Sequence, residues 1–258
     1  MEKISVIVPI HKINEDYNEM LYNALNSIGT FYDDVIVLIV CPPTIAKEVE
    51  NLPHKISKEI IINNGETDFC SQVNLGITKC DTKWFTILEV DDEFTPIWFK
   101  SMNEYTNEFK DVDVFLPIVR DINVEGKFIS FTNESTWAYG FCQEQGYLDN
   151  EVLLDFQNYQ ISGGLYNTEV IKENGMLKNN IKFSFGYEFL LRLTHNKVKV
   201  LTVPRIGYIH VNFREDSLFD NLKNGENKMT EKEVKFWIET AKKEFFFKNK
   251  RDVTYQEN

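Results

Sequence analysis

Three acidic side chains directly follow one strongly apolar segment in the first half of the chain. The segment 84–90 reads WFTILEV, and Asp91, Asp92 and Glu93 come next. If the segment is a strand, its alternation places Glu89 and Asp91 on the same side, where two carboxylates repel unless a cation lies between them. Mn²⁺ or Mg²⁺ would suit, because hard cations take a few protein oxygens and complete their shell with water or phosphate. The acidic turn is therefore a candidate metal site, and a solvated loop that caps the next helix is the alternative.

Strand-like and helix-like segments alternate around this turn and would position it. Unbroken apolar runs are typical of strands buried on both faces of a sheet, and amphipathic stretches such as 14–28 and 96–109 are typical of helices. The strand-like runs are 4–10, 35–40, 59–62, 84–90 and 112–119. This rhythm predicts an α/β fold with a mostly parallel open sheet and flanking helices, in which functional groups gather at the carboxyl ends of the strands.

The second half of the chain is less regular. It predicts a hairpin that turns at 123–126, a strand bent at Gly163 and Gly164, a helix over 184–196 and a strand over 198–203. A capping Thr67 is expected to start the helix that follows the third strand. We expect one domain over 1–220, with 221–258 as a C-terminal helical extension packed on it.

Charge and cysteine content narrow the class of protein. The 258 residues include 40 acidic and 28 basic side chains, a net charge of −12 that argues against general affinity for nucleic acid. Residues 228–251 are basic, so the terminal helix could touch an anionic membrane, although a solvated helix face is the favoured alternative. The four cysteines follow neither metal-ligand nor disulfide spacing, and no apolar run is long enough to span a bilayer. We therefore expect a soluble cytoplasmic protein.

Common nucleotide and nucleophile motifs are absent from the sequence. There is no G-x-x-x-x-G-K phosphate loop, no G-x-G-x-x-G after a strand and no G-x-S-x-G turn. A bound phosphate would therefore have to be neutralised by a metal ion together with isolated basic groups.

Several segments together resemble a family 2 glycosyltransferase of the GT-A fold over roughly residues 3–215. They are I-S-V-I-V-P-I at 4–10, Asn74-Leu75-Gly76-Ile77, Trp84-Phe85-x-x-Leu88-Glu89-x-Asp91-Asp92-x-x-x-Pro96, Gly163-Gly164-Leu165-Tyr166 and Glu188 to Arg192. The resemblance implies a GT-A-like nucleotide-diphospho-sugar transferase fold. It also implies a nucleotide-sugar donor, with a UDP-sugar favoured, a saccharide or other hydroxyl acceptor, a Mn²⁺ or Mg²⁺ ion, and inversion at the anomeric carbon.

The resemblance assigns donor and metal roles position by position. Pro9, Ile10 and His11 end the first strand, where the family holds the nucleotide base. Asn74 and Gly76 match the helix that borders the donor pocket. In the family's acidic motif, Glu89 and Asp91 match the metal ligands, and Asp91 is the better candidate of the two. Asp92 matches the further acidic residue of the motif and is expected to bind the donor.

The resemblance also assigns a catalytic residue and roles for two residues in the segment 208–217. Glu188 is the candidate general base, which would take the proton of the acceptor hydroxyl, and an ion pair with Arg192 one turn later is the equally weighted alternative. His210 could reach the metal, and Arg214 could contact phosphate.

Departures from the family pattern keep other functions open. Val40-Cys41-Pro42-Pro43 stands where an acidic pair is usual, Val73 replaces an arginine, and the usual acidic pair before the helix falls near Phe185 and Gly186. A non-catalytic nucleotide-sugar or glycan binding protein is one alternative. A nucleotidyltransferase, weakened by the lack of a Gly-rich loop, and a transferase acting on modified nucleic-acid bases are the others.

Overall fold

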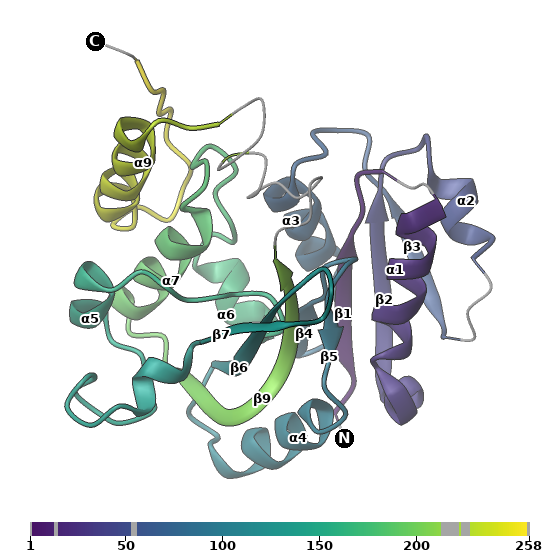
Figure 1. Ribbon diagram of the computed structural model, residues 1–258, viewed down its shortest axis with the longest axis horizontal. Coiled ribbons are helices and arrows are strands. Elements are labelled where there is room, and N and C mark those ends of the chain that lie inside the picture. Colours follow the sequence, from purple (N-terminus) through teal and green to yellow (C-terminus); the bar gives the residue numbers. More distant parts are fainter. Residues whose placement is uncertain (1, 13–14, 53–55, 213–221, 223–227, 257–258) are drawn as a thin grey trace.

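The computed structural model describes residues 2–12, 15–52, 56–212, 222 and 228–256. A mixed, curled sheet forms its centre, and helices cover both faces (Figure 1). The strands are β1 Ile4–Pro9, β2 Val35–Cys41, β3 Lys58–Ile62, β4 Trp84–Ile87, β5 Glu93–Phe94, β6 Val114–Asn123, β7 Phe128–Thr132, β8 Leu165–Asn167 and β9 Val200–Asn212. The helices are α1 Glu15–Asn26, α2 Ala46–Glu50, α3 Phe69–Lys79, α4 Trp98–Glu108, α5 Asn150–Asp155, α6 Thr168–Glu173, α7 Phe185–His195 and α9 Glu231–Glu244, with 3₁₀ turns η1 Gly29–Asp34 and η2 Glu134–Trp137.

The strands lie in the order β3-β2-β1-β4-β8-β6-β9-β5, and β7 pairs with β6 outside that path. Strands β1 to β4 are parallel to one another, and β6 is parallel to β9, whereas β5, β7 and β8 join as antiparallel strands. The predicted α/β fold with flanking helices is confirmed, and the strands that pair antiparallel all follow β4 in the sequence. The carboxyl ends of the parallel strands meet at one edge, toward the top of Figure 1.

Burial on both faces explains the unbroken apolar runs. In β1, Ile7 belongs to a core formed with α3, α7 and α9, whereas Val6 and Val8 belong to a second core formed with α1 and α4. Because successive side chains of a strand point to opposite faces, a strand buried on both sides needs an apolar residue at every position.

Two predicted element boundaries are wrong, and the first of them changes the geometry of the site. The segment predicted as a strand over 84–90 leaves the sheet after Ile87, whose carbonyl accepts a hydrogen bond from the N–H of Gly163. The N–H of Asp92 then bonds the carbonyl of Glu89, 3.2 Å away, so residues 89–92 form a turn and strand alternation does not apply to Glu89 and Asp91. The helix α3 is capped by Asp68, which accepts from Ser71 N at 3.0 Å, and not by Thr67.

The strand β9 is much longer than predicted. It continues past Pro204 to Asn212, and it remains paired with β6 through irregular register at Pro117 and Ile118. Its far end carries His210 to the same edge of the sheet as the turn after β4. The hairpin between β6 and β7 turns at 123–126 as predicted, with Gly126 at a φ of 78°.

The C-terminal helix α9 packs against α7 (Figure 1). Trp237, Ala241 and Phe245 are buried in this contact, whereas Phe246 and Phe247 are exposed. In the described part of the chain, no helix combines the length and apolar character that a bilayer crossing requires.

Candidate functional site

The turn after β4 holds Glu89 through two contacts with distant segments. The backbone N–H of Glu89 donates to the hydroxyl oxygen of Tyr208, 3.0 Å away on β9. The hydroxyl of Ser162 donates to Glu89 Oε1 at 2.6 Å. The strand β9 therefore holds the backbone of Glu89, and the glycine-rich bend before β8 holds its carboxylate.

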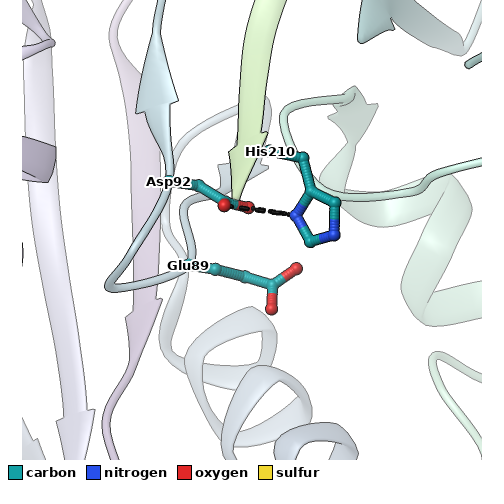
Figure 2. Close-up of side chains that lie close together, drawn as sticks. All are labelled: Glu89, Asp92 and His210. Carbon is teal, nitrogen blue, oxygen red and sulfur yellow. Dashed lines mark hydrogen bonds and ion pairs between the residues drawn. The ribbon is translucent and has the colours of Figure 1, made fainter. Parts of the chain in front are cut away.

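Asp92 is completely buried and is bonded to the end of β9. Its Oδ1 accepts from the backbone N–H of Val211 at 2.9 Å, and its Oδ2 lies 3.0 Å from Nδ1 of His210 (Figure 2). The His210 side chain is 22% exposed, so solvent reaches the site from the histidine side. A buried carboxylate needs such partners, because an unpaired one would pay a large desolvation penalty.

Glu89, Asp92 and His210 form one group of possible metal ligands. One ligand atom from each lies within 4.8 Å of the other two, and Figure 2 shows the Glu89 carboxylate beside the Asp92–His210 pair. Two carboxylates and an imidazole are a donor set that suits Mn²⁺ and also accepts Mg²⁺. The residues present therefore fit the divalent ion that the sequence predicts.

This grouping changes two sequence assignments. Asp92, predicted to bind the donor, lies within the ligand group, whereas Asp91, predicted as the direct ligand, does not belong to it. The reason is the turn at 89–92, which replaces the expected strand alternation and brings the first and fourth residues of the turn together.

Protons on Glu89 and His210 compete with a cation for this group. Burial of the Glu89 carboxyl, followed by the negative charge of Asp92, raises its pKa to about 7. Burial alone would lower the pKa of His210, but its charge interaction and hydrogen bond with Asp92 raise it to about 10. A proton on His210 therefore occupies part of the place that a divalent cation would take, and ion binding must release that proton.

Asp121 supports the histidine from the neighbouring strand, and the sequence did not single it out. It is buried and lies opposite His210 in the pairing of β6 with β9. Its carboxylate accepts from Ser130 at 3.0 Å, from Thr132 at 2.7 Å and from Asn212 at 3.1 Å. These bonds join β6, β7 and β9 at the site.

The structure gives Glu188 a structural position and contradicts the general-base assignment. Its side chain is fully buried on α7, and its carboxylate lies 2.8 Å from Lys178 Nζ and 2.8 Å from Arg192 Nε. Arg192 also donates to Glu188 Oε2 at 2.9 Å, so the ion pair considered as the alternative is present. A base must reach the acceptor hydroxyl, and this carboxylate is bonded to two buried cations instead.

Lys178 completes this buried cluster and ties it to the C-terminal helix. Its ammonium group donates to the carbonyl of Glu244 at 2.7 Å and to the carbonyl of Phe247. Arg192 bonds the carbonyls of Asn174 and Met176 in the same way. The sequence offered no signal for Lys178, because a lone lysine followed by two asparagines is typical of a surface residue.

Asn74 and Gly76 also have packing roles. Asn74 donates to the carbonyl of Leu177 at 2.7 Å and accepts from its N–H at 2.9 Å, so both ends of the amide are engaged. At Gly76, an added Cβ would lie 2.5 Å from Cγ2 of Ile7, so glycine allows α3 to approach β1 closely. Their predicted place beside the donor pocket stays a prediction.

The remaining assignments concern the end of β1 and Arg214. Pro9 and Ile10 are buried at the carboxyl end of β1, and His11 follows as an exposed residue whose ring lies 6.0 Å from that of Tyr17. Their predicted contact with a nucleotide base stays a prediction. Arg214 lies outside the described residues.

A family model decides the relationship of this chain to known proteins. The model described as glycosyl transferase family 2 matches residues 5–160, which include all of β1 but its first residue and the acidic turn with Glu89 and Asp92. The chain belongs to glycosyl transferase family 2. No curated protein sequence is significantly similar to it.

Solved structures with the fold of this family 2 chain include Staphylococcus aureus TarS. TarS 1–349 in complex with UDP has a TM-score of 0.63 at 15% identity, covering 83% of this chain and 62% of TarS 1–349. The same protein in complex with UDP-GlcNAc has a TM-score of 0.62 at 16% identity, covering 82% of this chain and 59% of the other. The likeness at this identity shows a shared fold, and the family 2 chain spans less than two thirds of either structure.

Proposed function

We propose that this chain transfers a sugar from a nucleotide-diphosphate donor to an acceptor hydroxyl, with a divalent cation bound by Glu89, Asp92 and His210. The observation that carries the proposal is the convergence of these three side chains at the carboxyl ends of strands in a family 2 chain. Open α/β sheets bind their ligands at that edge.

The residues of the site have distinct tasks in this proposal. When bound, the cation supplies positive charge that stabilises the leaving diphosphate. Ser162 orients the Glu89 carboxylate, and the N–H of Val211 holds Asp92 in place. His210 would have to lose a proton for its imidazole to bind the cation, because a proton and a metal ion compete for a nitrogen lone pair.

The proposed donor is a UDP-sugar. The structures similar in fold are those of a protein bound to UDP and to UDP-GlcNAc, which supports a nucleotide-sugar donor. Pro9, Ile10 and His11 lie at the carboxyl end of β1, at the same edge as the metal ligands, and we place the nucleotide there. The proposed acceptor is a saccharide or another hydroxyl compound.

The inverting course is supported by the family resemblance. Glu188 does not fit as its base, so inversion is best tested on the product and not on that residue. The anomeric configuration of the product, read by NMR from the coupling constant of its anomeric proton, distinguishes inversion from retention.

A direct test is turnover with a panel of nucleotide sugars, with and without Mn²⁺. We expect turnover of one UDP-sugar that stops when EDTA removes the ion and returns on adding Mn²⁺. Turnover that is unchanged in EDTA would contradict metal dependence, and turnover with only non-uridine donors would contradict the proposed base.

A non-catalytic nucleotide-sugar binding protein is the second candidate. The observation that favours it is the engagement of Glu188 by Lys178 and Arg192, which leaves the predicted base unable to act. Calorimetry separates the two candidates: saturable binding of a nucleotide sugar with Mn²⁺, without release of free nucleotide or of product for any donor and acceptor, would identify a binding protein.

We further propose the cytoplasm as the location. The structure holds all four cysteines as free thiols, three of them buried, which supports a reducing compartment.

A further inference from the structure

Exposed apolar side chains cluster on the hairpin formed by β6 and β7. Val124 is 62% exposed, Phe128 51%, Ile129 40% and Phe131 39%. The rings of Phe128 and Phe131 are 4.9 Å apart between centroids, so they form one continuous surface. Isolated exposed apolar residues are ordinary, but a contiguous group of this kind marks an interaction site.

The register of the strands shows that this surface continues across four strands. One row of paired residues crosses these strands and consists, in order, of Glu93 of β5, Ile209 of β9, Arg120 of β6 and Phe131 of β7. Side chains opposite one another share a face of the sheet. The next row on this face consists of Val211, Ile122 and Phe128. We call these seven residues the outer ribbon face.

The opposite face of the same strands carries the site. Asp121 and His210 each follow a member of the outer ribbon face directly in sequence and therefore point the other way. Asp121 is buried, whereas Arg120 beside it is exposed. The outer ribbon face is thus the solvent side of the ribbon that holds the candidate metal ligand.

The charges on the outer ribbon face are self-complementary. Glu93 and Arg120 are both exposed and stand on either side of Ile209. Within the described ranges, no ion pair joins either of them to another residue. A two-fold axis that lies in the interface above Ile209, along the direction of β9, would place each Arg120 opposite a Glu93, as an isologous contact requires.

We propose that the outer ribbon face binds a second copy of this chain in a two-fold symmetric dimer. Arg120 of one subunit pairs with Glu93 of the partner subunit, Ile209 and Val211 lie at the centre of the contact, and the apolar residues of β7 lie at its periphery. An acidic partner or an anionic lipid surface would leave Glu93 facing like charge, whereas a second copy matches both charges at once. Docking would also brace the ribbon that carries His210.

The test is the mass of the protein in solution, measured by sedimentation velocity from 1 to 100 µM. We expect a dimer whose dissociation constant rises about 10- to 100-fold in Arg120→Glu and in Glu93→Arg, because each creates two like-charge contacts. Equimolar mixing of the two variants should restore the dimer, because both ion pairs then re-form, one with its native polarity and one with the charges exchanged. Lys47→Glu and Glu48→Lys on the distant helix α2 provide matched charge controls.

The mixing experiment also covers a folding defect in either variant, because only folded chains can reassociate. A wild-type chain that stays monomeric up to 100 µM would overturn the proposal. So would a dimer that survives both single reversals, or two folded single variants, shown by circular dichroism, that remain monomeric after mixing. A monomer that binds anionic vesicles or a glycan through this face would overturn it in favour of that occupant.

Discussion

His210 and Asp92 are separated by 118 residues in the sequence, yet Nδ1 of the histidine lies 3.0 Å from Oδ2 of the aspartate. The long strand β9 makes this contact by running beside β6 to the edge where the turn after β4 ends. Glu89 completes a group of two carboxylates and one imidazole that could hold a metal ion.

Asp92→Asn should weaken Mn²⁺ binding more than Asp91→Asn. Asp92 belongs to the ligand group and Asp91 does not, so we expect roughly a 10- to 100-fold loss of affinity for the first variant. Isothermal titration of each variant with Mn²⁺ measures the difference. An equal or larger loss for Asp91→Asn would restore Asp91 as the direct ligand.

Metal affinity should rise with pH. The pKa of Glu89 is raised to about 7, so the carboxylate becomes available only as the pH passes that value. The pKa of His210 is raised to about 10, so the ion must displace its proton throughout the range from pH 7 to 8.5. Affinity should therefore increase about tenfold per pH unit above 7 and more steeply below it.

Titrations with Mn²⁺ at pH 6, 7, 8 and 8.5, each in two buffers of different ionisation enthalpy, measure both the affinity and the protons released. His195→Gln, which alters an exposed histidine, should leave the pH profile unchanged. A flat profile with no proton release would show that His210 is not displaced.

Ser162→Ala should move this pH profile upward. The hydroxyl of Ser162 donates to the Glu89 carboxylate at 2.6 Å and so favours its charged form. Losing a hydrogen bond to a charged group raises the pKa of that carboxyl, and the steep part of the profile should move up by about one pH unit. Ser135→Ala, which alters a bond to Tyr159 instead, is the matched control. A downward shift would contradict the assigned role of the serine.

Glu188→Gln should destabilise the fold without acting on the chemistry. It leaves Lys178 and Arg192 as buried cations without a counter-charge, which costs about 3–5 kcal/mol of unfolding free energy. Urea unfolding measures the loss, and Glu169→Gln, which breaks an exposed pair with Lys172, should change stability by less than about 1 kcal/mol. If turnover per folded molecule vanished while stability stayed at the wild-type level, Glu188 would be catalytic after all.

Gly76→Ala should destabilise the packing of α3 on β1. The added Cβ would lie 2.5 Å from Cγ2 of Ile7, and such overpacking costs about 1–3 kcal/mol. The double variant Gly76→Ala with Ile7→Ala should be less destabilised than the sum of the two single changes, because the clash is then removed. Strict additivity in urea unfolding would show that the two residues do not compete for space.

The strands and the acidic turn could be predicted because their signals are local. The apolar run of β1 and the acids after β4 are contiguous in the sequence, and each reports burial or charge at one place. The identity of the ligand group could not be predicted in full. Whether Asp91 or Asp92 faces Glu89 depends on where β4 ends, and the pairing of Ile87 with Gly163 decides that point.

The supporting residues escaped prediction because their partners are far away in the sequence. Tyr208 reaches Glu89 across 119 residues, and Ser162 reaches it across 73. The prediction that Glu188 is the general base failed for the same reason. Its position on an amphipathic helix and its distance from Arg192 were readable, but Lys178 comes from another segment and turns a plausible catalytic acid into a buried counter-ion.

The bonds from Lys178 to the carbonyls of Glu244 and Phe247 make the last turn of α9 part of the body's interior. Any shortened version of the protein that stops before residue 244 would remove both carbonyls and leave Glu188 as the partner of a buried ammonium group, so it should unfold at lower urea concentration than the full chain. A purification tag or a fluorescent fusion should therefore follow residue 256, beyond the segment whose carbonyls accept hydrogen bonds from Lys178.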